Sequence, residues 1–70
     1  MNNHLYIQLE QCGYMCFQTP GAQSITAAVQ MLIEACNSIG LDVANVEINR
    51  LELRDEAENT IEKAQRRYLC

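Results

Sequence analysis

Two short alternating runs on either side of a glycine constrain the fold of this chain more than any other feature. Residues 5–9 (LYIQL) and 14–19 (YMCFQT) place apolar side chains at every second position, which is the pattern of half-buried β-strands. Between them stands Gln11-Cys12-Gly13. Its glycine occupies the last position of a three-residue hairpin loop, where a left-handed backbone is usual. The pattern predicts a β-hairpin.

The length of this loop also predicts a register, because a slip of one residue would turn every side chain to the opposite face. We expect Leu9 to pair with Met15 and Ile7 with Phe17. A two-residue loop would instead leave Met15 and Phe17 on the polar side. The remaining pairs of the expected register are Glu10 with Tyr14, Gln8 with Cys16, and Tyr6 with Gln18.

A helix is expected after the hairpin, over residues 24–39. Thr19-Pro20-Gly21 ends the second strand, because proline lacks the backbone N–H that a strand ladder needs. Ser24 is a natural N-cap, and Gly40 stands where many helices end in a left-handed residue. Between these caps the apolar residues follow the helical period. They are Ile25, Val29, Leu32, Cys36 and Ile39.

Residues 43–49 are expected to form a third strand with its even-numbered side chains toward the core. The parity of the apolar residues then changes, since Leu51 and Leu53 are odd-numbered. Residues 49–54 therefore either continue the third strand after a bulge or begin the last helix. Both alternatives stay open at this point.

A C-terminal helix is expected over about residues 55–69. Asp55 opens a capping-box pattern, and a similar pattern at Asn49 offers an earlier start. Acidic residues crowd the first turn and basic residues the last, as the helix dipole favours. Glu62 and Arg66 add an i,i+4 ion pair. The sequence favours the start at Asp55.

These elements predict one small α+β domain, residues 1–70, with the order β-β-α-β-α. Its sheet would have three mostly antiparallel strands in the order 2-1-3, because the first strand can pair on both sides. The main helix would cover the apolar face of this sheet. The C-terminal helix has a weak apolar stripe and would dock at an edge of the sheet, on the polar face of the sheet, or on another subunit.

The charges of the chain are distributed unevenly. The 70 residues have a net charge of −4, and residues 1–49 contain no lysine or arginine. Nucleic-acid binding is not expected, because it requires clustered cations that neutralise phosphates. No signal-peptide pattern and no apolar run long enough for a membrane span are visible. We therefore expect a cytoplasmic protein whose thiols stay reduced and that makes no membrane contact.

The cysteines and the single histidine do not predict a catalytic or metal site. In an extended hairpin, Cys12 and Cys16 lie about 13 Å apart, too far to share an ion. His4 is remote from Cys16 and has no evident carboxylate to orient it. We expect no enzyme activity, no metal and no cofactor, since the groups that a site needs do not converge.

The polar face of the predicted sheet is the best candidate for a binding site. It would be mildly acidic, free of cations, and would carry two tyrosines, a residue enriched at interfaces. The alternative is an ordinary solvated face. If the face binds, its charge favours a partner protein with a basic surface. The expected partner-binding residues are Tyr6, Gln8, Glu10, Tyr14, Gln18 and Glu47.

The sequence thus predicts a non-catalytic protein-interaction module. Small acidic chains without a catalytic site are often inhibitors or accessory proteins, including those encoded by phages and mobile elements, such as anti-CRISPR proteins. The target would be a partner surface that is basic and handles nucleic acid. A first alternative is the subunit of a structural homo-oligomer whose tyrosine face is its own interface. A homodimer is also expected, because the second strand is an unprotected edge that could pair with a second copy. A lower alternative is a thiol or zinc-binding protein.

Overall fold

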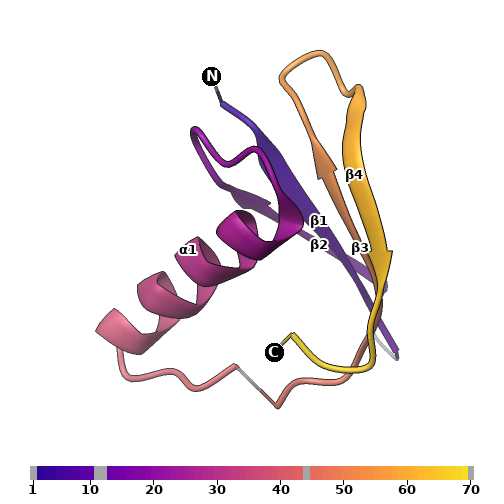
Figure 1. The fold of residues 1–70 in the computed structure, drawn as a ribbon. Helices are drawn as coiled ribbons and strands as arrows, with labels where there is room; N and C mark the ends of the chain where they lie inside the picture. Colours follow the sequence, from indigo (N-terminus) through magenta and orange to yellow (C-terminus); the bar gives the residue numbers. More distant parts are fainter. Residues whose placement is uncertain (1, 11–12, 44, 70) are drawn as a thin grey trace.

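The structure, a computed structural model, describes residues 2–10, 13–43 and 45–69, which form a four-stranded antiparallel sheet with one helix packed against it (Figure 1). The sheet order is β2-β1-β3-β4, so the predicted order 2-1-3 is found with a fourth strand added. The α+β class is confirmed. The elements in chain order are β1 (His4–Leu9), β2 (Gly13–Gln18), α1 (Ile25–Ser38), β3 (Ile48–Arg54) and β4 (Thr60–Gln65).

β1 and β2 form the predicted hairpin, but its register differs from the prediction by two residues. Gly13 is the first residue of β2 and pairs with Leu9, whereas the prediction placed it in the loop. Ile7 consequently pairs with Met15 instead of Phe17, and the predicted pairs were wrong. A shift of two residues keeps each side chain on its expected face, because side chains alternate with a period of two. Cys12 lies outside the described residues.

The predicted ends of the helix are confirmed. The Ser24 side chain accepts a hydrogen bond from the backbone N–H of Ala27 at 3.1 Å, as an N-cap does. At the other end Gly40 has a φ of +78°, and the N–H of Leu41 donates to the carbonyl of Cys36 at 2.9 Å. This is the 6→1 bond of a Schellman motif, which satisfies a carbonyl that the helix leaves free.

β3 begins later and runs further than the predicted third strand, and the bulge alternative is correct. Leu9 pairs with Ile48 but Gln8 pairs with Arg50, so one extra residue, Asn49, interrupts the ladder. A bulge of this kind changes the parity of the strand. It brings both Ile48 and Leu51 to the core face, although their numbers differ in parity. The predicted strand residue Ala44 lies outside the described residues.

The predicted C-terminal helix is wrong, because residues 60–65 form β4. The carboxylate of Asp55 accepts from the backbone N–H groups of Ala57 and Asn59, both at 2.9 Å, which folds the segment into a tight turn. Glu58 completes this turn with a φ of +66°. An Asp side chain bonded to nearby N–H groups suits a turn as well as a helix start, so the capping-box pattern was ambiguous.

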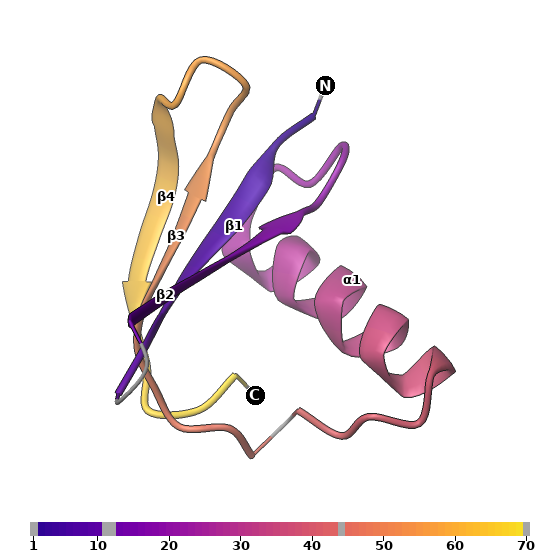
Figure 2. The same ribbon diagram turned by 180° about the vertical axis from the view of Figure 1, so that it is seen from behind.

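The core lies between α1 and one face of the sheet, and α1 covers that face only (Figures 1 and 2). Within the described ranges no helix covers the other face, which carries Tyr6 and Tyr14. The segment after β4 turns back on the side of the sheet that α1 covers, and Leu69 is buried in the core. The buried apolar residues are Leu5, Ile7, Ala22, Ile25, Ala28, Val29, Leu32, Ile48, Leu51, Leu53 and Leu69. No helix among the described residues is long and apolar enough to cross a bilayer.

Candidate functional site: the outer face of the sheet

The face of the sheet opposite α1, called the outer face below, carries alternate side chains of all four strands. The predicted residues Tyr6, Gln8, Tyr14 and Gln18 lie on it together, as the strand parity indicated. Tyr14 pairs with Gln8, so the two tyrosines are diagonal neighbours on adjacent strands. The members of the outer face are His4, Tyr6, Gln8, Tyr14, Cys16, Gln18, Arg50, Glu52, Arg54, Thr60, Lys63 and Gln65.

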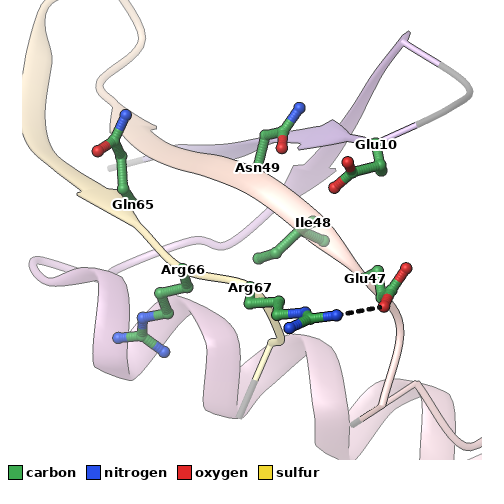
Figure 3. A pocket seen from close by; sticks show the side chains of 7 residues that line it. All are labelled: Glu10, Glu47, Ile48, Asn49, Gln65, Arg66 and Arg67. Atoms are coloured by element: carbon green, nitrogen blue, oxygen red, sulfur yellow. Dashed lines mark ion pairs between the residues drawn. The ribbon is translucent and has the colours of Figure 1, made fainter.

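The predicted residues Glu10 and Glu47 lie outside the strands of the sheet. Both border a hollow of about 450 Å³ near the start of β3 and the end of β4 (Figure 3). Arg67 extends toward Glu47, and the two side chains form an ion pair at 3.5 Å. Arg66 points away from Glu47 and donates to the carbonyl of Leu69 at 3.1 Å. Neither of these two carboxylates lines the hollow that contains Tyr6 and Tyr14.

The prediction that the outer face is free of cations is wrong. Because β3 continues to Arg54 and β4 replaces the expected helix, the outer face receives Arg50, Arg54 and Lys63. The sequence signal for the first two was present in the alternation of residues 48–54 (INRLELR), in which charged and apolar side chains change places at every step after the bulge. Lys63 could not be placed without β4.

The two tyrosines differ in exposure. Tyr14 is 70% exposed, the highest value among the aromatic side chains that the structure describes. Tyr6 is half-buried, because the guanidinium carbon of Arg54 lies 4.4 Å from the centre of its ring in a cation–π contact. Both rings line a hollow of about 530 Å³ on the outer face, together with Arg50 and Lys63. Tyr14 is therefore the aromatic side chain of the outer face that is most free to meet a partner.

Arg54 is the centre of a hydrogen-bonded cluster at one end of the outer face. Its Nε and Nη2 atoms donate to the two carboxylate oxygens of Glu52 at 2.9 and 3.2 Å, a bidentate arrangement. Its Nη1 atom donates to Glu58 at 3.0 Å. The Tyr6 hydroxyl donates to the same carboxylate at 3.2 Å, and Nε2 of His4 lies 3.2 Å from it. The cluster fixes Tyr6 in place.

The charges of this cluster are held in their ionised forms. The hydrogen bonds from Arg54 and Thr60 lower the pKa of the buried Glu52 carboxyl to about 2. The bond from Arg54 likewise lowers the pKa of Glu58. Partial burial, followed by the bond to Glu58, raises the pKa of the Tyr6 hydroxyl. Arg54 is consequently committed to two carboxylates inside the molecule and has little capacity left for an external anion.

Arg50 and Lys63 are in a different situation. Both side chains are exposed and line the hollow beside Tyr14, and neither forms an ion pair with any described residue. Lys63 stands opposite Glu52 in the ladder, whose carboxylate is already bonded to Arg54 and Thr60. The centre of the outer face thus presents one exposed aromatic ring and two available cations. Sequence reasoning found the ring and missed the cations.

The thiols and carboxylates provide no assembled reactive site in the part of the chain that the structure describes. No group of three His, Cys, Asp or Glu side chains there could hold a metal ion. Cys16 is exposed on the outer face, Cys36 is half-buried on α1, and both are free thiols. The predicted separation of Cys16 from Cys12 stays a prediction, since Cys12 lies outside the described residues.

No family model matches this chain, and no curated protein or solved structure matches it closely enough to carry an argument. A function for the outer face must therefore be argued from its own residues.

Proposed function

We propose that this protein is a non-catalytic protein-interaction module, an inhibitor or accessory protein that occupies a partner protein with its outer face. The observation that supports this proposal best is the exposure of Tyr14, 70%, at the rim of a hollow of about 530 Å³. A strand-borne tyrosine offers a large apolar ring with a polar tip, and it loses little conformational entropy on binding. Such residues are enriched among those that dominate binding energy.

The neighbours of Tyr14 suit a protein partner of mixed charge. The prediction of a partner with a basic surface depended on a face without cations, whereas Arg50 and Lys63 lie beside the ring. Partner carboxylates opposite these two cations would be complementary. Basic groups of the partner would fit at the acidic turn before β4, which carries Asp55, Glu56 and Glu58. Complementary charges of this kind select a partner and accelerate its association more than they add affinity.

A rigid support holds the proposed binding residues in place. Tyr6 is clamped by Arg54 and Glu58, and Gln8 and Tyr14 face each other across the β1–β2 ladder. Side chains that are already ordered lose less entropy when a partner binds, so a small face can bind with useful affinity. The hollow holds no arrangement of nucleophile, base and orienting group within the described residues, so its geometry suits recognition.

The test is affinity capture from a lysate of the source cells with three purified chains. The wild-type chain is compared with the double variant Tyr14→Ala/Arg50→Ala and with Glu34→Ala, an exposed change on α1 on the other side of the molecule. We expect the wild type and Glu34→Ala to retain one shared set of proteins, identified by mass spectrometry, and the double variant to lose it. Circular dichroism establishes that all three chains are folded.

Two results would overturn the proposal. Equal capture by the double variant would show that the outer face does not bind the partner. A capture that disappears on nuclease treatment, together with salt-dependent binding of a single-stranded oligonucleotide, would replace the protein partner by nucleic acid, since exposed tyrosines and cations can also stack and neutralise single strands.

A further inference from the structure

The two edges of the sheet are unequal. β4 (TIEKAQ) carries the charged residues Glu62 and Lys63, and the ladder beside it is interrupted by an irregularity between Leu53 and Arg54. Charges and bulges are the devices by which edge strands avoid pairing with other strands. β2 (GYMCFQ) has no charged residue, no proline and an uninterrupted ladder with β1. The edge at β2 is therefore open to another strand.

The direction of the free backbone groups on β2 follows from its ladder with β1. The N–H of Thr19 donates to the carbonyl of Asn3 at 2.9 Å, so odd-numbered residues of β2 point their backbone groups toward β1. Even-numbered residues point theirs toward the open edge, because these directions alternate along a strand. The residues with outward N–H and C=O groups are Tyr14, Cys16 and Gln18.

We propose that a second copy of this chain pairs with β2 in antiparallel fashion, with Cys16 opposite Cys16 of the second copy. In this register Tyr14 of each copy pairs with Gln18 of the other. The backbone N–H and C=O groups of Tyr14, Cys16 and Gln18 then all form hydrogen bonds with the second copy. A shift by two residues in one direction would bring Pro20, which has no N–H, opposite Tyr14. The pairing is closed by a two-fold axis and is self-complementary, as symmetric dimers require.

The same register also fits the apolar side of the sheet. Met15 of one copy would stand opposite Phe17 of the other, and no like charges meet at any position. Both residues line an open apolar groove of about 370 Å³ between the sheet and the second half of α1. The groove is open at β2 because α1 packs mainly against β1, β3 and β4. The groove also exposes Ile39 and Leu41. The second copy would cover its open side with apolar side chains.

This dimer is independent of the proposed partner protein and compatible with it. A two-fold axis perpendicular to the sheet keeps both outer faces on the same side, so each Tyr14 would lie beside Gln18 of the second copy. The exposed rings, Arg50 and Lys63 would then form one continuous doubled surface. Failure of the dimer would leave the outer face of a single chain available for its partner.

The first test is the oligomeric state of the full chain, measured by light scattering during size-exclusion chromatography under reducing conditions. We expect about twice the mass of one chain. Met15→Lys should raise the dimer dissociation constant at least about tenfold, since it places two cations near each other in the apolar groove. The matched control is Ile61→Lys on the β4 edge, because Ile61 has almost the same exposure as Met15, 40% against 42%. This control should leave the dimer unchanged.

The second test fixes the register by cross-linking. In a chain that keeps Cys16 and carries Cys12→Ser, Cys36→Ala and Cys70→Ser, mild oxidation should join two chains. Residues in a bonded antiparallel pair have Cα atoms about 5.5 Å apart, within the range of a disulfide. The comparison chain lacks Cys16 and carries Gln18→Cys, whose thiols would be about 13 Å apart and should not join. A monomer at all accessible concentrations, or equal cross-linking of the two chains, would overturn the proposal.

Discussion

The carboxylate of Glu62 in β4 accepts a hydrogen bond from the backbone N–H of Ile25, the first residue of α1, at 2.6 Å. The first turn of α1 contains no acidic residue of its own. Glu62 therefore supplies from a distant strand both an acceptor for a free N–H group and a negative charge at the positive end of the helix dipole. The contact joins the helix to the β4 side of the sheet.

Replacement of Glu62 should destabilise the protein by loosening this junction. We expect Glu62→Ala to lower the free energy of unfolding by about 1 kcal/mol, and Glu62→Gln by less, because the amide keeps an acceptor and loses the charge. Urea unfolding followed by circular dichroism measures both. Glu34→Ala, an exposed carboxylate of α1 bonded only to Gln30, serves as the control and should change stability by less than about 0.5 kcal/mol. An equal loss in the control would show that Glu62 contributes nothing specific.

The stability of the protein should decrease in acid because of Glu52. Its carboxyl pKa is lowered from 4.5 to about 2 in the folded state by bonds from Arg54 and Thr60. Because the pKa is lower in the folded state, the ionised carboxylate stabilises the fold at pH values above its unfolded pKa of 4.5. This contribution to stability is lost as the pH falls from about 4.5 toward 2. Unfolding measured across this range should therefore show a progressive loss.

The variant Glu52→Gln separates this effect from general acid denaturation. It should lower stability at pH 7 by about 2 kcal/mol, because Arg54 loses a bidentate charged partner. It should also flatten the dependence on pH below 4.5, since the titrating group is absent. A variant with the wild-type slope would show that other carboxylates control the acid transition.

The hairpin and α1 could be predicted from the sequence because local signals determine both. The alternation around Gly13 fixes which side chains share a face, and Ser24 and Gly40 fix the ends of the helix. The exact register could not be predicted, since registers that differ by two residues place the same side chains on the same face. The placement of Tyr6 and Tyr14 on the outer face depended only on parity and is correct.

β4 could not be predicted, because its local signals favour a helix. Asp55 resembles a helix cap, and Glu62 and Arg66 have helical spacing, yet pairing with β3 and the bond from Ile25 assign Glu62 to a strand. Partners this distant in sequence leave no local pattern, and tertiary contacts override weak propensities. The missing strand carried Lys63, so the charge of the outer face was predicted with the wrong sign at its centre.

Leu53 should be among the most sensitive core positions. Its side chain is completely buried between the sheet and α1, so Leu53→Ala removes buried methyl groups and leaves a cavity. We expect a loss of about 3 kcal/mol in the free energy of unfolding. The control Ile61→Ala, at a β4 side chain that is 40% exposed, should cost less than about 1.5 kcal/mol. Comparable losses at the two positions would place Leu53 outside the core.

Asp55 should be essential for the turn that allows β4 to form. Its Oδ1 atom accepts from the N–H groups of both Ala57 and Asn59, and the bond from Asn59 is the main reason why its pKa is lowered. Asp55→Ala should reduce stability by about 1–2 kcal/mol, since both N–H groups lose their acceptor. Asp55→Asn keeps an acceptor oxygen without the charge and should lie between the alanine variant and the wild type.

Hydrogen exchange distinguishes this turn from a helix start. If residues 55–69 form the β3–β4 turn and β4, the N–H groups of Ala57 and Asn59 should exchange faster in Asp55→Ala. The N–H of Ile48, which donates to the carbonyl of Arg67, should lose protection only through global unfolding. If residues 55–69 were helical, removal of the cap would instead increase exchange along that whole segment and reduce the helical circular dichroism signal. The pattern of exchange therefore decides between a local turn that positions Lys63 on the outer face and a helix that would remove it.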